Sequence, residues 1–245
     1  MNRLLVAIAF LTRLPVPWSG ALDARAVGRA SLLFPAVGLL LGGAQAAALH
    51  VMAARLPATL AAVLAVALAA ALTGALHLDG LADTADGFGG GRDREHALAI
   101  MRDHAVGAFG ATALVLVLAV KAAAIVALAS TGAWRWILLA PALARWVPVA
   151  LARALPYARA GDGLGRTVTD GAGAFELAGA TLLAVGAAVG LAGVRGVLAL
   201  GAVAGFTLGH GLACRRRIGG VTGDTMGAAV ELAEALALVA GVALG

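Results

Sequence analysis

Three aspartates with helical spacing form the strongest chemical pattern in the sequence. Asp79, Asp83 and Asp86 belong to the segment His77-Leu-Asp-Gly-Leu-Ala-Asp-Thr-Ala-Asp-Gly87. On an α-helix they fall within an arc of about 60°, so their carboxylates share one face. Three such anions repel one another unless a cation neutralises them, and oxygen ligands alone favour Mg²⁺ or Mn²⁺ over zinc. The pattern predicts a divalent-metal site, with a solvated acidic helix end as the alternative.

Basic and glycine-rich residues follow this segment. Gly89-Gly-Gly-Arg-Asp-Arg94 precedes Met101-Arg-Asp-His104, and Pro156 to Gly165 is a further loop rich in glycine and arginine. Arginine binds phosphate oxygens through paired N–H groups, and glycine lets backbone N–H groups approach an anion. Carboxylates that hold a metal beside such arginines are typical of a phosphoryl-transfer site. The alternative role for these arginines is membrane anchoring, and a glycine-rich loop alone is weak support.

A second anion-binding pattern lies near the C-terminus, in Gly219-Gly-Val-Thr-Gly-Asp-Thr-Met-Gly227. Asp224 or Thr225 can cap a helix that begins here. The N-terminus of such a helix favours an anion such as phosphate, although a plain cap needs no ligand.

Four charged residues fall deeper in apolar segments: Lys121, Arg145, Glu231 and Glu234. Charged groups inside a membrane are unfavourable and are usually paired or functional. The two cations can pair with the two acids or with a substrate phosphate, and the spacing does not decide between these roles.

The composition indicates the elements that must position these groups. Of the 245 residues, 62% are hydrophobic and only 13% are charged, about half of the usual charged share of a soluble domain. Long apolar runs predict an all-α, polytopic transmembrane helical bundle with about seven spans, six to eight in total. The alternative for the weakest runs is a buried core helix or a hairpin that enters the bilayer and returns. We place the runs at 32–54, 58–78, 106–130, 134–155, 173–192, 195–213 and 226–244.

Charge is distributed unevenly between two sets of connections. With a cytoplasmic N-terminus, most arginines fall in inner segments, whereas the outer turns hold only Arg55, Arg135 and Arg195. This is the positive-inside distribution of a multispanning protein. All 13 Asp and Glu residues fall in inner segments or in the inner parts of spans. We therefore expect an active site that faces the cytoplasm, and no nucleic-acid partner.

The chain is expected to form one domain, 1–245, because no repeat or soluble linker divides it. Residues 1–31 are expected to form an N-terminal interfacial segment, since the apolar stretch from Leu4 to Leu11 is too short to span. A cleaved signal peptide is the alternative. Cys214 is the only cysteine, so no intrachain disulfide is possible.

Motifs spread over nearly the whole chain resemble one family. They are Phe10-Leu-Thr-Arg-Leu-Pro15, His77 to Gly87, Ile100-Met-Arg-Asp103, Gly163-Leu-Gly165, and Gly219 to Ala228 with Glu231. The family is cobalamin synthase, the adenosylcobinamide-GDP ribazoletransferases of late vitamin B12 assembly. The second and the last of these motifs are specific, because neither is a generic membrane pattern.

The resemblance implies a Mg²⁺-dependent transferase of the bacterial inner membrane. In this reaction α-ribazole, or its 5′-phosphate, attacks adenosylcobinamide-GDP, GMP leaves, and adenosylcobalamin or its 5′-phosphate is formed. The implied partners are these two substrates and membrane lipid, with other late corrinoid-assembly enzymes as further partners. Asp83-x-x-Asp86-Gly87 also looks like part of the signature of CDP-alcohol phosphatidyltransferases, whose later Gly and Asp residues do not match here in register.

The residues and the resemblance together predict a metal-assisted phosphoryl-transfer site. We expect Mg²⁺ to be bound by Asp79, Asp83, Asp86 and Asp103. The first three are the predicted catalytic residues, together with His104 as a possible proton acceptor. The predicted substrate and phosphate contacts are His77, Arg92, Arg94, Arg102, Lys121, Arg145, Thr222, Asp224 and Glu231.

Two other classes of function stay open at this point. A transporter or channel with an acidic cytoplasmic-side cation site would also carry intramembrane Lys, Arg and Glu. Transporters, however, place their decisive polar groups near the midplane, often in two related halves, whereas the acids here gather at one surface. The other class is a scaffold for other corrinoid enzymes. Product formation by the purified protein alone would exclude it.

Overall fold

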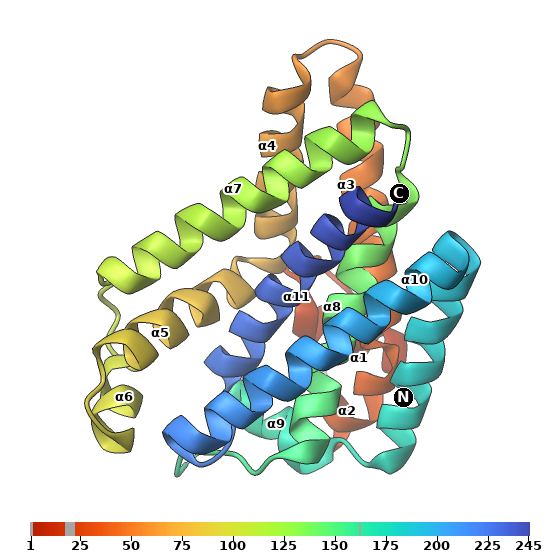
Figure 1. The fold of residues 1–245 in the computed structure, drawn as a ribbon. Helices are drawn as coiled ribbons and strands as arrows, with labels where there is room; N and C mark the ends of the chain where they lie inside the picture. The colour runs from red at the N-terminus through yellow and green to blue at the C-terminus, as the bar shows by residue number, and fades with distance from the viewer. Residues whose placement is uncertain (1, 18–22, 162) are drawn as a thin grey trace.

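The computed structural model describes residues 2–17, 23–161 and 163–245, and these form a bundle of helices (Figure 1). The predicted all-α class is confirmed. Residues 1 and 18–22 of the predicted interfacial segment lie outside the described residues. The elements are α1 (Arg3–Leu11), α2 (Ala24–Ala30), the 3-10 turn η1 (Ser31–Leu33), α3 (Phe34–Ala53), α4 (Ala58–Thr73), α5 (Leu76–Gly90), α6 (Arg94–Ile100), α7 (Ala108–Ser130), α8 (Arg135–Ala154), α9 (Leu164–Gly171), α10 (Ala174–Ile218) and α11 (Gly223–Leu244).

Within the described residues, five helical units are long and apolar enough to cross a bilayer. These are the continuous stretch Ala24–Ala53, which includes α3, and helices α7, α8, α10 and α11. Helices α4 and α5 pass the same test only as a pair, which would make a sixth span. The chain is therefore a multi-pass membrane protein.

The second predicted span, 58–78, is interrupted. Helix α4 ends at Thr73, and the axis turns by 93° before α5 continues. Gly74 and Ala75 cause the turn, because both adopt left-handed backbone angles, with φ of 62° and 56°. The bend directs α5, with its aspartates, away from the axis of α4.

Helix α10 contains two of the predicted spans. Gly193 interrupts its helical geometry with φ 57° and ψ −139°, and the chain reverses there (Figure 1). The two arms touch closely, since a Cβ on Gly196 would lie 2.1 Å from the carbonyl oxygen of Ala188. The runs 173–192 and 195–213 are thus the arms of one helical hairpin.

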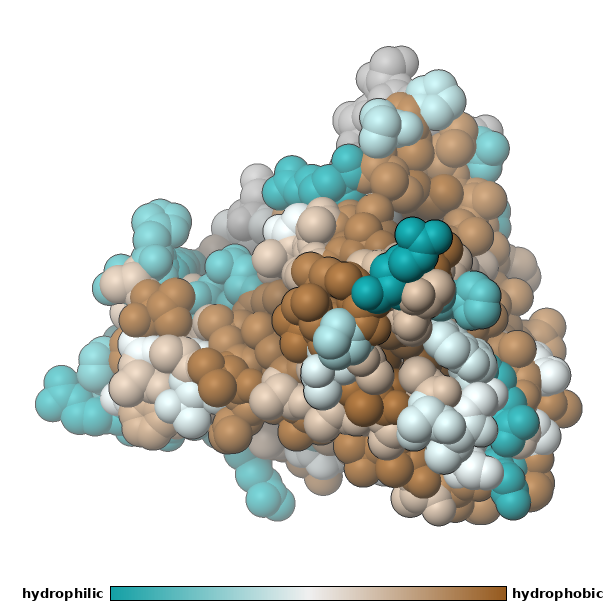
Figure 2. All heavy atoms as spheres, turned by 90° about the horizontal axis from the view of Figure 1, so that it is seen from above, coloured by the Kyte–Doolittle hydropathy of each residue, from teal (hydrophilic) through white to brown (hydrophobic). Residues whose placement is uncertain are grey.

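The outer helices expose large apolar side chains. A soluble protein rarely leaves extended apolar patches in water, and such patches mark membrane or protein contacts. Figure 2 shows the molecule from above, at the end where α3 and α4 are joined, and hydrophobic residues cover much of this surface too. The exposed apolar side chains of the outer helices suit the flank of the bundle to a lipid environment. Exposed examples on α4, α7 and α10 are Leu60, Val63, Val115, Leu116, Leu182, Leu198, Leu208 and Leu212.

The connections fall at two ends of the bundle (Figure 1). The α3–α4 and α7–α8 turns and the C-terminus lie at one end, at the top of the view. Helices α5, α6 and α9 and the α10–α11 connection lie at the other. The arginine-rich and acid-rich connections thus share one end, and its cytoplasmic orientation stays a prediction. Helix α1 packs against α2 and α3 and buries Val6, Ala7 and Leu11.

Candidate active site

Helix α5 and the first turn of α11 meet at close range because glycine stands on both sides of the contact. A Cβ on Gly80 would lie 2.7 Å from the carbonyl oxygen of Asp224, and a Cβ on Gly227 would lie 3.3 Å from the Cα of His77. Small residues allow helix backbones to approach in this way. The contact brings the acidic face of α5 beside Asp224.

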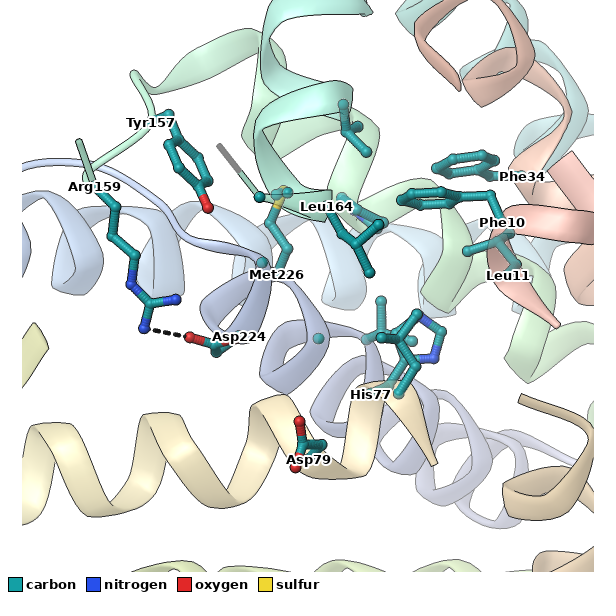
Figure 3. Close-up of a pocket in the computed structure, with 18 of the residues that line it drawn as sticks. Phe10, Leu11, Phe34, His77, Asp79, Tyr157, Arg159, Leu164, Asp224 and Met226 are labelled. Carbon is teal, nitrogen blue, oxygen red and sulfur yellow. Dashed lines mark ion pairs between the residues drawn. The ribbon is translucent and has the colours of Figure 1, made fainter. Parts of the chain in front are cut away.

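A cavity of about 320 Å³ lies at this contact. Figure 3 shows Tyr157, Arg159 and Asp224 on one side of it and Phe10, Leu11 and Phe34 on the other. The cavity therefore has a polar region next to the aspartates and an apolar region next to α1. Its polar and charged lining residues are His77, Asp79, Arg102, Tyr157, Arg159 and Asp224.

Three carboxylates gather across the α5–α11 contact. Asp79 is exposed and lines the cavity, and Asp83 follows one turn later on the same helix. The acid that acts most strongly on Asp83 is Asp224, followed by Asp79, and Arg159 offsets part of this charge. Arg159 Nη2 lies 2.6 Å from Asp224 Oδ2. The site thus joins two aspartates of one helix to a third from another.

Asp86, the third aspartate of the pattern, makes different contacts. Its Oδ2 accepts the N–H of Gly107 at 2.7 Å, and its Oδ1 accepts the N–H of Gly110 at 2.9 Å. These groups belong to the N-terminal turn of α7, where a carboxylate is favoured by the helix dipole. In the structure Asp86 therefore fixes α7 against α5, and the geometry does not place it in the cavity.

The carboxylates that remain suit Mg²⁺. Among the described residues, no three His, Cys, Asp or Glu side chains are close enough to form a closed metal cluster. Mg²⁺ does not require one, because it usually keeps several waters and is held by one or two carboxylates together with substrate phosphates. Asp79, Asp83 and Asp224 provide an open set of oxygen donors of this kind.

The other predicted site residues divide into two groups. His77 and Arg102 line the cavity with Asp79 and Asp224. The remaining surface residues lie outside its lining. Asp103 and His104 are exposed on the α6–α7 connection, and Arg92 is exposed before α6.

Two further predicted contacts have structural partners. Arg94 donates to two backbone carbonyls, each at 2.8 Å, and so joins α6 to the end of α10 and to the loop before α9. Thr222 is buried and caps α11, since its side chain accepts the N–H of Thr225. Both residues hold the cavity walls in place rather than line them.

Lys121, Arg145, Glu231 and Glu234 form a buried ion cluster between α7, α8 and α11. Lys121 Nζ lies 2.9 Å from Glu231 Oε2 and 2.7 Å from Glu234 Oε1, and Arg145 pairs with the other oxygen of Glu234. Each side chain is at most 6% exposed. Of the two alternatives that the sequence left open, the structure shows pairing with the acids. Lys121, Arg145 and Glu231 do not line the cavity between α5 and α11.

Tyr157 and Arg159 were missing from the predicted site. Their loop is fixed to the α10–α11 connection, since Ala158 N–H donates to Val221 at 2.8 Å and Val221 N–H donates to Pro156 at 2.9 Å. Burial raises the pKa of the Tyr157 phenol, which keeps it a neutral hydrogen-bond donor. The glycine-rich and arginine-rich composition of 156–165 was the only sequence signal for this wall.

Gly80→Ala is expected to lower activity by disturbing the contact that brings the carboxylates together. The new Cβ would overlap the backbone of Asp224, and overpacking of this kind costs about 1–3 kcal/mol of stability. The check is transferase activity per amount of folded protein. Gly90→Ala is the matched control, because its Cβ would meet only the Ile100 side chain at 3.5 Å. Equal specific activity of the two variants would show that the close approach does not position the site.

Comparison with known proteins covers almost the whole chain. Residues 3–242 match the family model of cobalamin-5-phosphate synthase. The curated adenosylcobinamide-GDP ribazoletransferase of Chlorobium phaeobacteroides is 41% identical, over 100% of this chain and 98% of that protein. Its counterpart in Syntrophobacter fumaroxidans is 41% identical over 96% and 95%, and that of Pseudomonas aeruginosa is 43% identical over 98% and 97%. No solved structure matches the chain.

Proposed function

Because this chain belongs to the cobalamin-5-phosphate synthase family, we propose that the cavity between α5 and α11 is where it joins α-ribazole, or its 5′-phosphate, to adenosylcobinamide-GDP. The activity follows from the family match and from relatives that are adenosylcobinamide-GDP ribazoletransferases. The single observation that supports this location is the meeting of Asp79, Arg159 and Asp224 in the lining of one cavity, with Asp83 one turn further along α5 and within range of their charges.

The reaction exchanges one bond to phosphorus for another. A ribose hydroxyl oxygen of α-ribazole attacks the phosphorus next to the cobinamide. The bond from that phosphorus to the bridging oxygen breaks, and GMP leaves with this oxygen. The hydroxyl proton passes to a base, so the transfer produces one GMP for each corrinoid product and involves no redox change.

The residues of the cavity fit the charges that this exchange develops. Asp79, Asp83 and Asp224 would hold Mg²⁺, which offsets negative charge on the transferring phosphoryl group and on departing GMP. Arg159 and Arg102 present guanidinium groups that can bind phosphate oxygens. The carboxylates that line the cavity, those of Asp79 and Asp224, are closer candidates for the proton acceptor than the exposed His104.

We further propose that the protein lies in the bacterial inner membrane with the cavity end toward the cytoplasm. The support is the arginine content of the connections at that end. Membrane lipid would cover the apolar flank. Other late corrinoid-assembly enzymes are proposed as partners on the basis of the family alone.

Metal removal tests this proposal with the purified protein in lipid nanodiscs. With adenosylcobinamide-GDP, α-ribazole and Mg²⁺, we expect corrinoid product and GMP in equal amounts, measured by chromatography. A chelator should abolish transfer, and added Mg²⁺ or Mn²⁺ should restore it. Folded protein that makes no product with Mg²⁺ would contradict the assigned activity. Full activity in excess chelator would contradict the metal site alone.

A further inference from the structure

The apolar side of the cavity presents a flat aromatic surface that the phosphoryl chemistry does not use. The rings of Phe10 and Phe34 are stacked, with centroids 5.6 Å apart and an interplanar angle of 9°. Phe34 is fully buried, whereas Phe10 is half-buried, and both line the cavity. Figure 3 shows the pair across the cavity from Arg159 and Asp224. Phe34 therefore supports Phe10 as a rigid wall.

The residues around this wall are also apolar. Leu164 of α9 and Met226 of α11 lie between the aromatic pair and the polar region, and Leu11 of α1 lies beside the pair (Figure 3). The cavity is thus amphiphilic, with an aromatic region at one side and carboxylates and a guanidinium at the other. A ligand that fills it should have a flat apolar part joined to a polar part.

Size excludes the corrin ring from the cavity. A volume of about 320 Å³ is at the lower limit of small-molecule sites, which span roughly 300–1,000 Å³, and a corrin macrocycle with its amide side chains is several times larger. The volume suits a nucleoside, and two nucleosides take part in the reaction: α-ribazole and the guanosine of adenosylcobinamide-GDP. The apolar wall favours the base of α-ribazole, because guanine carries more polar groups on its edges.

His77 adds a polar group to the same region. Its side chain is buried and lines the cavity, and its Nδ1 has no hydrogen-bond partner among the residues that the structure describes. Buried polar atoms normally have partners, and an imidazole can donate to or accept from a ligand nitrogen or hydroxyl. His77 therefore adds a polar group without a partner among the described residues to the cavity that the aromatic wall also lines.

We propose that Phe10, backed by Phe34, binds the benzimidazole base of α-ribazole by stacking, and that His77 contributes to the recognition of the base. This inference rests on the proposed function, since it assigns α-ribazole to the cavity and the corrin ring of the other substrate to the space outside it. The base lies on the aromatic wall, and the ribose extends toward Asp79 and Asp224, where its hydroxyl attacks. Phe10 begins the motif Phe10-Leu-Thr-Arg-Leu-Pro15 and lies on helix α1. This motif would therefore help to select α-ribazole as the acceptor.

Phe10→Ala tests the proposal in two assays. In steady-state kinetics the KM for α-ribazole should rise by about 10–100-fold, because stacking of a base on an aromatic ring accounts for such a factor. The KM for adenosylcobinamide-GDP should not change. In calorimetric titration of the purified protein with α-ribazole alone, the Kd should rise by a similar factor. Phe10→Tyr, which keeps the ring, should restore both constants.

The control is Phe206→Ala, which removes a partly buried aromatic ring of α10 that packs on His210 outside the cavity. This variant should keep the wild-type KM and Kd for α-ribazole. An unchanged Kd in Phe10→Ala, or an equal rise in the KM of both substrates, would overturn the base-binding role. Wild-type protein that binds α-ribazole through Phe10 but makes no product would instead overturn the proposed function and leave the base site intact.

Discussion

Replacing Asp83 with Asn is expected to reduce ribazole transfer by about 10²–10³-fold, with little change in the yield of folded protein. Asp83 lies within range of the charges of both Asp224 and Asp79, and Asn keeps its shape while it removes the charge. The loss of one preorganised electrostatic contact to a transition state, or of a metal ligand, accounts for effects of this size. Activity with saturating substrates, measured over a range of Mg²⁺ concentrations, is the check.

The control for this variant is Glu95→Gln, which removes the same charge from the exposed surface of α6 at the same end of the bundle. Glu95→Gln should retain wild-type activity, and Asp83→Asn should need more Mg²⁺ for whatever activity is left. Wild-type transfer by Asp83→Asn at ordinary Mg²⁺ would exclude Asp83 from the metal site.

Glu234→Gln is expected to lower the free energy of unfolding by about 3–5 kcal/mol. Glu234 pairs with both Lys121 and Arg145 inside the bundle, and removing one partner of a buried pair leaves uncompensated charge. Glu231→Gln should destabilise less, because Lys121 then keeps Glu234 as its partner. Unfolding in detergent, followed by circular dichroism, measures both variants.

The same pair of variants distinguishes a structural role from substrate binding. If the cluster only holds α7, α8 and α11 together, Glu231→Gln protein that stays folded should show ordinary KM values for both substrates. Raised KM values without lost stability would contradict this and would support the sequence-based expectation that Lys121, Arg145 and Glu231 contact substrate.

Hydropathy predicted the helices well because lipid exposure requires long apolar runs. Each predicted run corresponds to helical structure, and the break predicted between 173–192 and 195–213 is where Gly193 reverses the chain within α10. One feature of the backbone was not predictable from residue type. Ala75 adopts a left-handed conformation that alanine rarely takes, so the bend between α4 and α5 has no clear sequence signal.

The part of the candidate site that lies on a single helix, α5, could be predicted from the sequence. Helical periodicity placed Asp79 and Asp83 on one face, and the structure agrees. Periodicity does not say which helix packs on that face, so it could not show that Asp86 turns to the N-terminus of α7. Arg159 was missed for the same reason, because its partner Asp224 belongs to a distant segment.

In the proposed metal site, Asp79, Asp83 and Asp224 hold a divalent ion against the diphosphate of the corrinoid substrate. Electron paramagnetic resonance of Mn²⁺ bound to the purified protein with adenosylcobinamide-GDP reports whether phosphorus lies next to the ion. We predict bound Mn²⁺ with hyperfine coupling to phosphorus in the wild type, and loss of this signal in the Asp79→Asn, Asp83→Asn double variant. The same coupling at the same Mn²⁺ affinity in the folded double variant would show that these aspartates do not hold the ion.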